Sequence, residues 1–195
     1  MERKKEIKRK TSETDILLDI NLDGRGVSEI DTGIAFLDHM LTLFSKHGLI
    51  DLTVKAVGDL EVDCHHTVED IGIVLGSALN EALGDKEGIY RYGSARIPMD
   101  EALVEVDLDF GGRAFLVYDV ETFEGSVGGM EVQLFEEFFR SVSTNAKMNL
   151  HINKVYGRNA HHIIEGVFKA FGKAVMTASS KNPRIVGVMS TKGTI

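Results

Sequence analysis

The spacing of apolar residues changes several times along the chain. Between residues 16 and 22, Ile and Leu recur at every second position, which predicts a strand with one buried face that ends at the turn 23–26. Between residues 36 and 44 the spacing changes to three and four, which predicts a helix with Gly48 just past its end. Short strands over 52–56 and 60–62 and a helix over 65–83 complete the first half.

The second half repeats this order of elements. Alternating apolar residues over 103–108 predict a strand that runs to the turn Gly111-Gly112-Arg113, and residues 115–120 are expected to pair with it as a hairpin. The other expected elements are helices over 134–142 and 161–175, a strand from 150 to 152, a closing strand over 186–188 and a polar tail over 190–193.

Two sequence matches indicate internal duplication. Residues 11–16 match residues 98–103 at an offset of 87, and His65-His66-x-x-Glu69 matches His161-His162-x-x-Glu165 at an offset of 96. We therefore predict an α/β protein of the α+β type, with mixed β-sheets packed on helices around a pseudo-twofold axis. The halves are placed at residues 1–88 and 89–195, and together they form one compact catalytic unit.

Composition narrows the class of protein. The 195 residues carry a formal net charge of −8, which argues against a nucleic-acid partner despite six Lys or Arg in the first ten residues. That basic tip is interpreted as a solvated start to the first strand. No apolar run is long enough to cross a membrane and no secretory signal is evident, so we expect no membrane partner and a cytoplasmic location. Cys64 is the single cysteine and is expected to be a small buried residue rather than a ligand.

The HHxxE motif carries the candidate chemistry. On a helix, His65 and Glu69 share one face because they are four residues apart, while His66 lies about 100 degrees around the axis. Two adjacent histidines cannot easily bind the same ion, but each can reach a different one. Two copies of the motif at equivalent positions of a repeat therefore predict two metal sites.

Two further histidines could complete the metal shells. His39 lies on the first predicted helix and His151 lies on a strand. With these two, the candidate ligands are His39, His65, His66, Glu69, His151, His161, His162 and Glu165. Divided over two ions, they give each ion three imidazoles and one carboxylate, which leaves octahedral positions for substrate or water. His47 is assigned to the end of a helix, where it favours the macrodipole.

Several cationic and hydroxyl side chains could bind an anionic group near these ions. The candidates are Arg91, Arg113, Lys169, Ser190 and Lys192. Lys169 follows Glu165 by one helical turn, and Arg113 follows two glycines in a turn. Basic groups beside a two-metal site suit a phosphate ester.

Long ordered motifs resemble the imidazoleglycerol-phosphate dehydratase family, over about residues 9–193. The runs that carry the resemblance are Phe36-Leu37-Asp38-His39-Met40, Lys46-His47-Gly48, Gly58-Asp59-Leu60, Asp63-Cys64-His65-His66-Thr67-Val68-Glu69-Asp70, Arg91-Tyr92-Gly93-Ser94-Ala95, Pro98-Met99-Asp100-Glu101-Ala102-Leu103, Asn159-Ala160-His161-His162 with Glu165, and Ser190-Thr191-Lys192-Gly193. No motif position departs from the family pattern.

The resemblance implies a lyase of histidine biosynthesis that converts imidazole glycerol phosphate to imidazole acetol phosphate and water. It also implies two Mn²⁺ ions per active site, although other divalent cations could bind, and a homo-oligomer of 24 subunits built from trimers, with active sites between subunits. The eight candidate ligands match the family's ligands, and the five anion-binding candidates match its phosphate-binding positions. Glu13 matches an acidic residue that handles protons.

A mechanism follows as a hypothesis. The proton to be lost is not activated by a carbonyl, so direct deprotonation would be very slow. If both ring nitrogens bind metals, the resulting imidazolate, held by ligands that include His65, His66, His161 and His162, can expel the hydroxyl and give a diazafulvene-like intermediate. Glu13 could then remove the acidified proton as the catalytic base.

Two other functions remain open from the residues alone. A zinc hydrolase would use one ion to activate water and would not need the second HHxxE motif. A structural or storage metalloprotein would have closed coordination shells and would not need the Arg and Lys residues to share a cleft.

Overall fold

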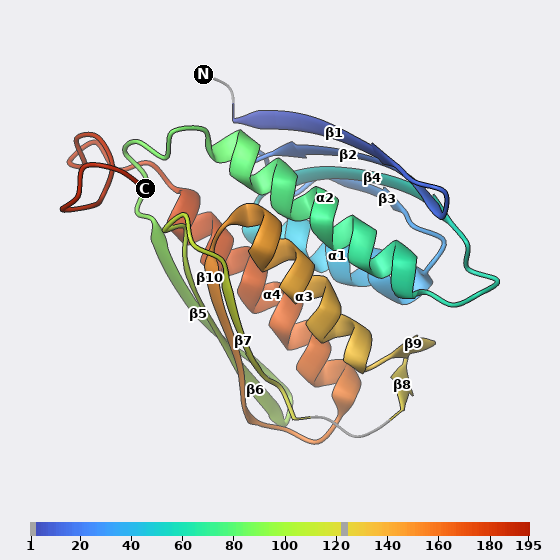
Figure 1. The fold of residues 1–195 in the computed structure, drawn as a ribbon. Helices are drawn as coiled ribbons and strands as arrows, with labels where there is room; N and C mark the ends of the chain where they lie inside the picture. Colours follow the sequence, from blue (N-terminus) through green and yellow to red (C-terminus); the bar gives the residue numbers. More distant parts are fainter. Residues whose placement is uncertain (1–2, 122–124) are drawn as a thin grey trace.

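The computed structural model describes residues 3–121 and 125–195 as two four-stranded sheets with four helices between them (Figure 1). The strands are β1 (Lys4–Lys10), β2 (Thr14–Asn21), β3 (Ser28–Asp31), β4 (Asp51–Gly58), β5 (Tyr92–Met99), β6 (Ala102–Asp109), β7 (Phe115–Asp119), β8 (Ser126–Val127), β9 (Met130–Glu131) and β10 (Asn149–Tyr156). The helices are α1 (Ala35–Gly48), α2 (His65–Leu83), α3 (Gln133–Ala146) and α4 (Ala160–Ser179). No helix among these residues is long and apolar enough to span a bilayer.

The two large sheets have the same connectivity. Their strand orders are β1-β2-β4-β3 and β5-β6-β10-β7, and in each the last pair is parallel while the others are antiparallel. The first helix of each half ends alike, because Ser45 Oγ donates to the Ile50 carbonyl (2.7 Å) and Ser143 Oγ donates to the Met148 carbonyl (2.8 Å). The α+β class and the similarity of the two halves are confirmed.

The offset between β2 and β6, the second strand of each half, is 88 rather than 87. Ile16 and Val104 both face the core, whereas Leu103, which the offset of 87 matches with Ile16, is only partly buried. A slip of one residue in a strand moves every side chain to the other face, so burial decides the alignment. The offset of 88 makes Glu13 equivalent to Glu101, each in the turn between the first two strands of its sheet.

Helices from different halves pack together in the middle layer. α1 packs on α4, and α3 packs on α2. Glycines allow both close approaches, because a Cβ on Gly172 would lie 2.6 Å from the Phe44 carbonyl oxygen and a Cβ on Gly76 would lie 2.5 Å from that of Val142. The apolar faces of the two halves therefore meet in one core.

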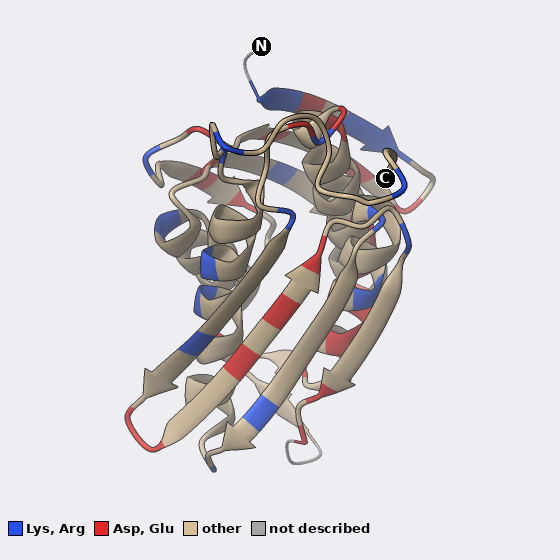
Figure 2. Cartoon of the chain, turned by 90° about the vertical axis from the view of Figure 1, so that its left-hand side faces the viewer, with Lys and Arg blue, Asp and Glu red and all other residues tan. Residues whose placement is uncertain are grey.

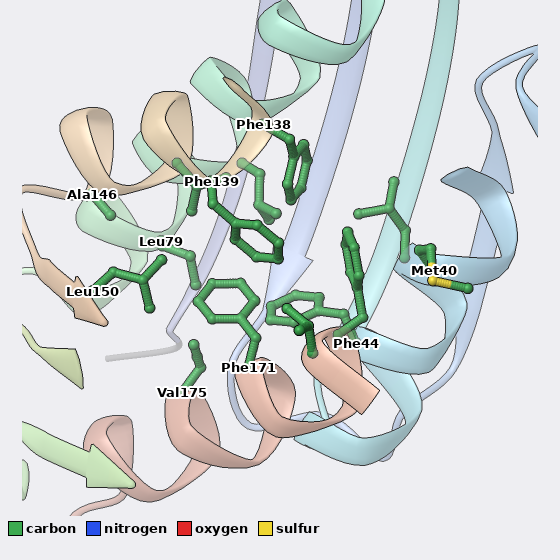
Figure 3. Close-up of a cluster of buried hydrophobic side chains, with 14 of the residues drawn as sticks. Met40, Phe44, Leu79, Phe138, Phe139, Ala146, Leu150, Phe171 and Val175 are labelled. Carbon is green, nitrogen blue, oxygen red and sulfur yellow. The ribbon is translucent and has the colours of Figure 1, made fainter. Parts of the chain in front are cut away.

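Phenylalanines fill the space between these helices (Figure 3). The Phe44 and Phe171 rings stack with centroids 5.0 Å apart, and the Phe138 and Phe139 rings meet edge to face at 5.1 Å. Helices α1, α3 and α4 all contribute to this cluster. Burial of such rings is a large part of the hydrophobic stabilisation of a fold, at roughly 1.5–3 kcal/mol for each side chain.

One predicted strand pairing and one predicted strand boundary are wrong. The segment 115–120 was expected to form a hairpin with 103–108, but β7 pairs in parallel with β10, and β5 and β10 flank β6. The hairpin partner of β6 is β5, which its mixed polar sequence had concealed. The basic tip likewise forms a separate edge strand, β1, rather than the start of β2.

Three smaller predictions also need correction. The segment 60–62 forms a turn, in which the Val62 N–H donates to the Asp59 carbonyl (2.8 Å). Residues 186–188 form no strand, and Val186 is 94% exposed, so its apolar side chain is not part of a sheet or the core. Gly48 is the last residue of α1 rather than the residue after it, and Leu49, which follows, takes the left-handed conformation with φ 52°. Gly48 is instead required by contact with α4, where Gly172 leaves little room.

Candidate active site

Three of the predicted metal ligands meet between α1 and α4. The ligand atoms of His39, His161 and Glu165 lie within 4.8 Å of one another. Glu165 Oε2 is 3.1 Å from His161 Nε2 and 3.5 Å from His39 Nε2. The spacing of four residues brings His161 and Glu165 to one face of α4, and α1 places His39 opposite them. Two imidazoles and one carboxylate form a donor set suited to a divalent transition metal.

Lys169 lies beside this cluster. Its Nζ is 2.6 Å from Glu165 Oε1. Burial acts to raise the pKa of Glu165, but the Lys169 ammonium and hydrogen bonds from the two imidazoles outweigh burial and lower that pKa. His47 is on the same side, where burial and then the charges of Lys169 and Lys173 lower its pKa. The cluster is thus a carboxylate surrounded by nitrogen groups.

His162 points away from this cluster to the turn between β5 and β6. Its Nδ1 is 2.7 Å from Glu101 Oε2, and its Nε2 is 3.8 Å from Asp100 Oδ2. Glu101 Oε1 also accepts hydrogen bonds from the backbone N–H groups of Arg158 (3.2 Å) and Asn159 (2.8 Å), at the start of α4. The hydrogen bond from His162, followed by these backbone donors, lowers the pKa of Glu101 to about 2.

His66 has the corresponding environment in the first half. Its Nδ1 is 3.0 Å from Asp59 Oδ2 and 3.8 Å from Glu13 Oε2. The hydrogen bond with Asp59 is the main cause that raises the pKa of His66. The ring of His65 is 6.3 Å from that of His66 and nearly perpendicular to it, at 78°. The adjacent histidines therefore diverge, as the helical spacing predicts.

A hydrogen-bond network fixes the turn that carries Glu13. Thr11 Oγ1 accepts the backbone N–H groups of Glu13 (3.1 Å) and Thr14 (3.0 Å). Thr14 Oγ1 donates to Asp70 Oδ2 at 2.5 Å, and Arg9 Nε lies 2.9 Å from Asp70 Oδ1. Asp70 is 7% exposed and lies on α2, one residue after Glu69. The position of Glu13 is thereby coupled to the helix that carries His65 and His66.

Four of the five anion-binding candidates line one cavity of about 660 Å³ at the other end of the molecule. They are Arg91, Arg113, Ser190 and Lys192. Lys169 is the exception, since it lies beside Glu165. The cavity is formed by the turn after β6 and by the C-terminal tail, so its wall brings together segments far apart in sequence.

Asp109 holds the Arg91 side chain at the edge of this cavity. Arg91 Nε and Nη2 donate to the two oxygens of Asp109, at 2.6 and 2.8 Å. Arg91 Nη1 donates to the Met189 carbonyl at 2.8 Å, and the guanidinium lies over the Tyr92 ring, 4.8 Å from its centroid. The hydrogen bonds to Asp109 raise the pKa of Arg91. The guanidinium is therefore a fixed positive charge.

His151 lies on the open outer face of the second sheet. It is exposed and sits between Asp107 of β6 and Val117 of β7. Figure 2 shows this sheet from its outer side, with the acidic residues of β6 coloured red. Asn149, two residues before His151, pairs with Asp109, which holds Arg91. His151 is thus on the side of the cavity, away from His39.

The cluster of candidate metal ligands and the cavity lie at opposite ends of α4. The Arg91 N–H donates to the Ala178 carbonyl (2.8 Å) near the end of this helix, whereas His161 is in its first turn. At 1.5 Å per residue, His161 and Ala178 are roughly 25 Å apart along the axis. One small substrate cannot contact both groups within a single chain.

Sequence reasoning missed three carboxylates of this site. Asp59, Glu101 and Asp109 each contact a candidate side chain. Glu101 could have been found, because an offset of 88 matches it with Glu13, whereas the offset of 87 matched Glu13 with Asp100. Asp59 follows a strand and Asp109 ends one, and no sequence pattern separates them from other polar residues at strand ends.

The chain is similar to several known proteins. The family model for imidazoleglycerol-phosphate dehydratase matches residues 32–175. A protein named imidazoleglycerol-phosphate dehydratase from Acetivibrio thermocellus is 61% identical over 193 residues, or 99% of each chain. One of the same name from Clostridium acetobutylicum is 59% identical over 97% of this chain and 96% of that protein. The crystal structure of the dehydratase from Staphylococcus aureus matches with a TM-score of 0.83 and 40% identity, over 92% of this chain and 99% of that one.

The duplicated α/β fold and these matches define the class as a carbon–oxygen lyase. More particularly, the chain belongs to the imidazoleglycerol-phosphate dehydratase family, whose activity is part of histidine biosynthesis.

Proposed function

We propose that this enzyme dehydrates imidazole glycerol phosphate to imidazole acetol phosphate with two divalent cations, Mn²⁺ in the cell. The observation that carries the metal dependence is the convergence of His39, His161 and Glu165 within 4.8 Å. A hydrolase or a storage protein gains no comparable support, because the relatives at 61% and 59% identity are named as dehydratases.

The remaining candidate ligands would complete the two shells. His65, His66 and Glu69 lie in the first turns of α2, and His162 lies beside His161 on α4. Held by these residues, the ions would act as Lewis acids toward the imidazole ring of the substrate and would favour loss of the neighbouring hydroxyl. Glu13, half-exposed and 3.8 Å from His66, is proposed to remove the proton from the next carbon.

The proposed site requires a second copy of the chain. The cluster at the start of α4 and the phosphate-binding cavity are roughly 25 Å apart along the helix axis. A substrate bound through both its ring and its phosphate therefore needs the cluster of one chain and the cavity of another. This separation supports a homo-oligomer with active sites between subunits, as expected from the family's trimers and its 24-subunit shell.

A cytoplasmic location is also proposed. Cys64 is a free, partly buried thiol, which a reducing compartment preserves.

The decisive experiment is a turnover assay on metal-stripped protein. Mn²⁺ is added stepwise with imidazole glycerol phosphate, and the ketone product is measured. We expect activity to rise to a plateau near two ions per chain. Full activity without added or residual metal would overturn the metal dependence, and tight metal binding without product would overturn the dehydratase activity.

A further inference from the structure

The second histidine of each HHxxE motif has a carboxylate partner at Nδ1. Glu101 is 2.7 Å from His162 Nδ1, and Asp59 is 3.0 Å from His66 Nδ1. An ionised carboxylate only accepts hydrogen bonds, so Nδ1 must carry the hydrogen in each contact. In a neutral ring, this leaves the lone pair on Nε2, which is the atom available to a metal.

The two carboxylates do not occupy equivalent positions of the repeat. Glu101 is in the turn between β5 and β6, and Asp59 follows β4. Tyr156, after a bulge in β10, pairs with Leu103 as Val57 pairs with Asp15, so Gly157 corresponds to Gly58. The position equivalent to Asp59 in the second half is therefore Arg158, which is not a carboxylate. The same contact with Nδ1 is thus made from two different elements. Inheritance through duplication cannot account for it, whereas a shared requirement of the two histidines can.

The equivalence of Glu13 and Glu101 strengthens this argument. Both occupy the turn between the first two strands of a sheet, but only Glu101 contacts its histidine closely, while Glu13 remains 3.8 Å from His66 Nδ1. Asp59 makes the close contact in the first half. Glu101 is also fixed by two backbone N–H groups, whereas Glu13 has no such bond to its carboxylate within the described residues.

We propose that Asp59 and Glu101 are positioning residues that fix the Nδ1–H tautomer and orientation of His66 and His162, so that Nε2 is presented to the divalent cation. In the first half, Asp59 performs this role and leaves Glu13 free for proton transfer. This inference rests on the proposed metal dependence, and it assigns different roles to two equivalent glutamates.

The test measures binding of Mn²⁺ alone to the full-length, metal-stripped protein by calorimetry and by the EPR signal of free Mn²⁺. We expect Glu101→Gln and Asp59→Asn to weaken the affinity of at least one ion by about 10- to 100-fold, the usual effect of losing such a partner. Glu13→Gln is expected to keep the Mn²⁺ affinity and to lose turnover. Glu29→Gln, which removes an exposed carboxylate paired with Lys55 at 2.8 Å, is the control and should bind as the unaltered protein does.

A double-mutant cycle separates positioning from structural support. If Glu101 acts through His162, Glu101→Gln should have no further effect on Mn²⁺ affinity when His162→Ala is already present. An equal loss with and without His162 would show that Glu101 acts by supporting the start of α4, and would overturn the proposal. Unchanged affinity in Glu101→Gln would also overturn it. If the unaltered protein bound no Mn²⁺, the proposed metal dependence would fail first and this inference would fail with it.

Discussion

Glu13 and Glu101 are the same residue type in equivalent turns, yet their surroundings differ. Glu101 accepts hydrogen bonds from His162 and from two backbone N–H groups, so its charge is held in place. Glu13 lacks these contacts, and Asp59 is the closer partner of His66. This freedom suits the proposed role of Glu13 as a base, because tight hydrogen bonding stabilises the charged form of a carboxylate and weakens it as a base.

The hydrogen bonds to Glu101 predict how stability depends on pH in the metal-free protein. They lower the pKa of Glu101 from 4.5 to about 2, so their contribution is complete above 4.5 and is lost as pH falls towards 2. We expect the unaltered protein to be more stable than Glu101→Gln above this window and the difference to close within it. Denaturant unfolding at a series of pH values measures this. A difference that stays constant down to pH 2 would mean that Glu101 is not held as described.

At the scale of elements, the contact between α1 and α4 depends on a glycine. A Cβ on Gly172 would lie 2.6 Å from the Phe44 carbonyl oxygen, and backbone atoms cannot move aside as a flexible side chain can. We expect Gly172→Ala to lower the free energy of unfolding by about 1–3 kcal/mol, the usual cost of overpacking, despite the better helix propensity of alanine. Equilibrium unfolding in denaturant gives the value.

The control for this change is Thr177→Ala, at an exposed position on the same helix. It should alter stability by no more than about 0.5 kcal/mol. If Gly172→Ala proved as stable as the unaltered protein, the close approach of the two helices would not be a constraint on this position.

The elements with strong apolar periodicity could be predicted from sequence, whereas strand pairing could not. All four helices lie where their three- and four-residue spacing predicted. The parallel pairing of β7 with β10 was missed because nothing local distinguishes it from a hairpin with β6. Strands β1 and β5 were not recognised because they lie at sheet edges, where solvent-facing polar residues weaken the alternation.

The candidate residues were predictable by type, but their grouping was not. Helical spacing placed His161 with Glu165, and the repeat pointed to both histidine pairs. The contact of His39 with His161 and Glu165 depends on the packing of α1 on α4. His151 lies far from these residues because it is on the exposed face of its sheet. Such relations come from tertiary structure, which the spacing of motifs does not encode.

At the scale of the whole molecule, the cluster around Glu165 and the cavity beside Arg91 lie far apart within one chain. This separation predicts that two inactive variants, one damaged in each place, restore activity when they assemble together. His161→Ala damages the cluster and Arg113→Ala damages the cavity, so each variant alone should have little activity. If each site combines a cluster and a cavity from different chains, mixed oligomers contain some sites in which both parts are intact. Random mixing in equal amounts should restore activity to about one quarter of that of the unaltered protein.

The measurement is turnover after the two variants are unfolded together and refolded as a mixture. Each variant refolded alone provides the control for incomplete assembly. Mixed oligomers that stay as inactive as the separate variants would contradict a site between chains.

The crossed packing of the helices also has a consequence for synthesis on the ribosome. α1 is complete at Gly48, but its partner α4 begins only at Ala160. Until α4 has left the exit tunnel, the surface of α1 that packs on α4 lacks its partner, and the glycine contact at Gly172 cannot form. A nascent chain of this enzyme therefore exposes apolar surface for most of its translation. Its first half should depend on chaperones or on rapid elongation to avoid aggregation.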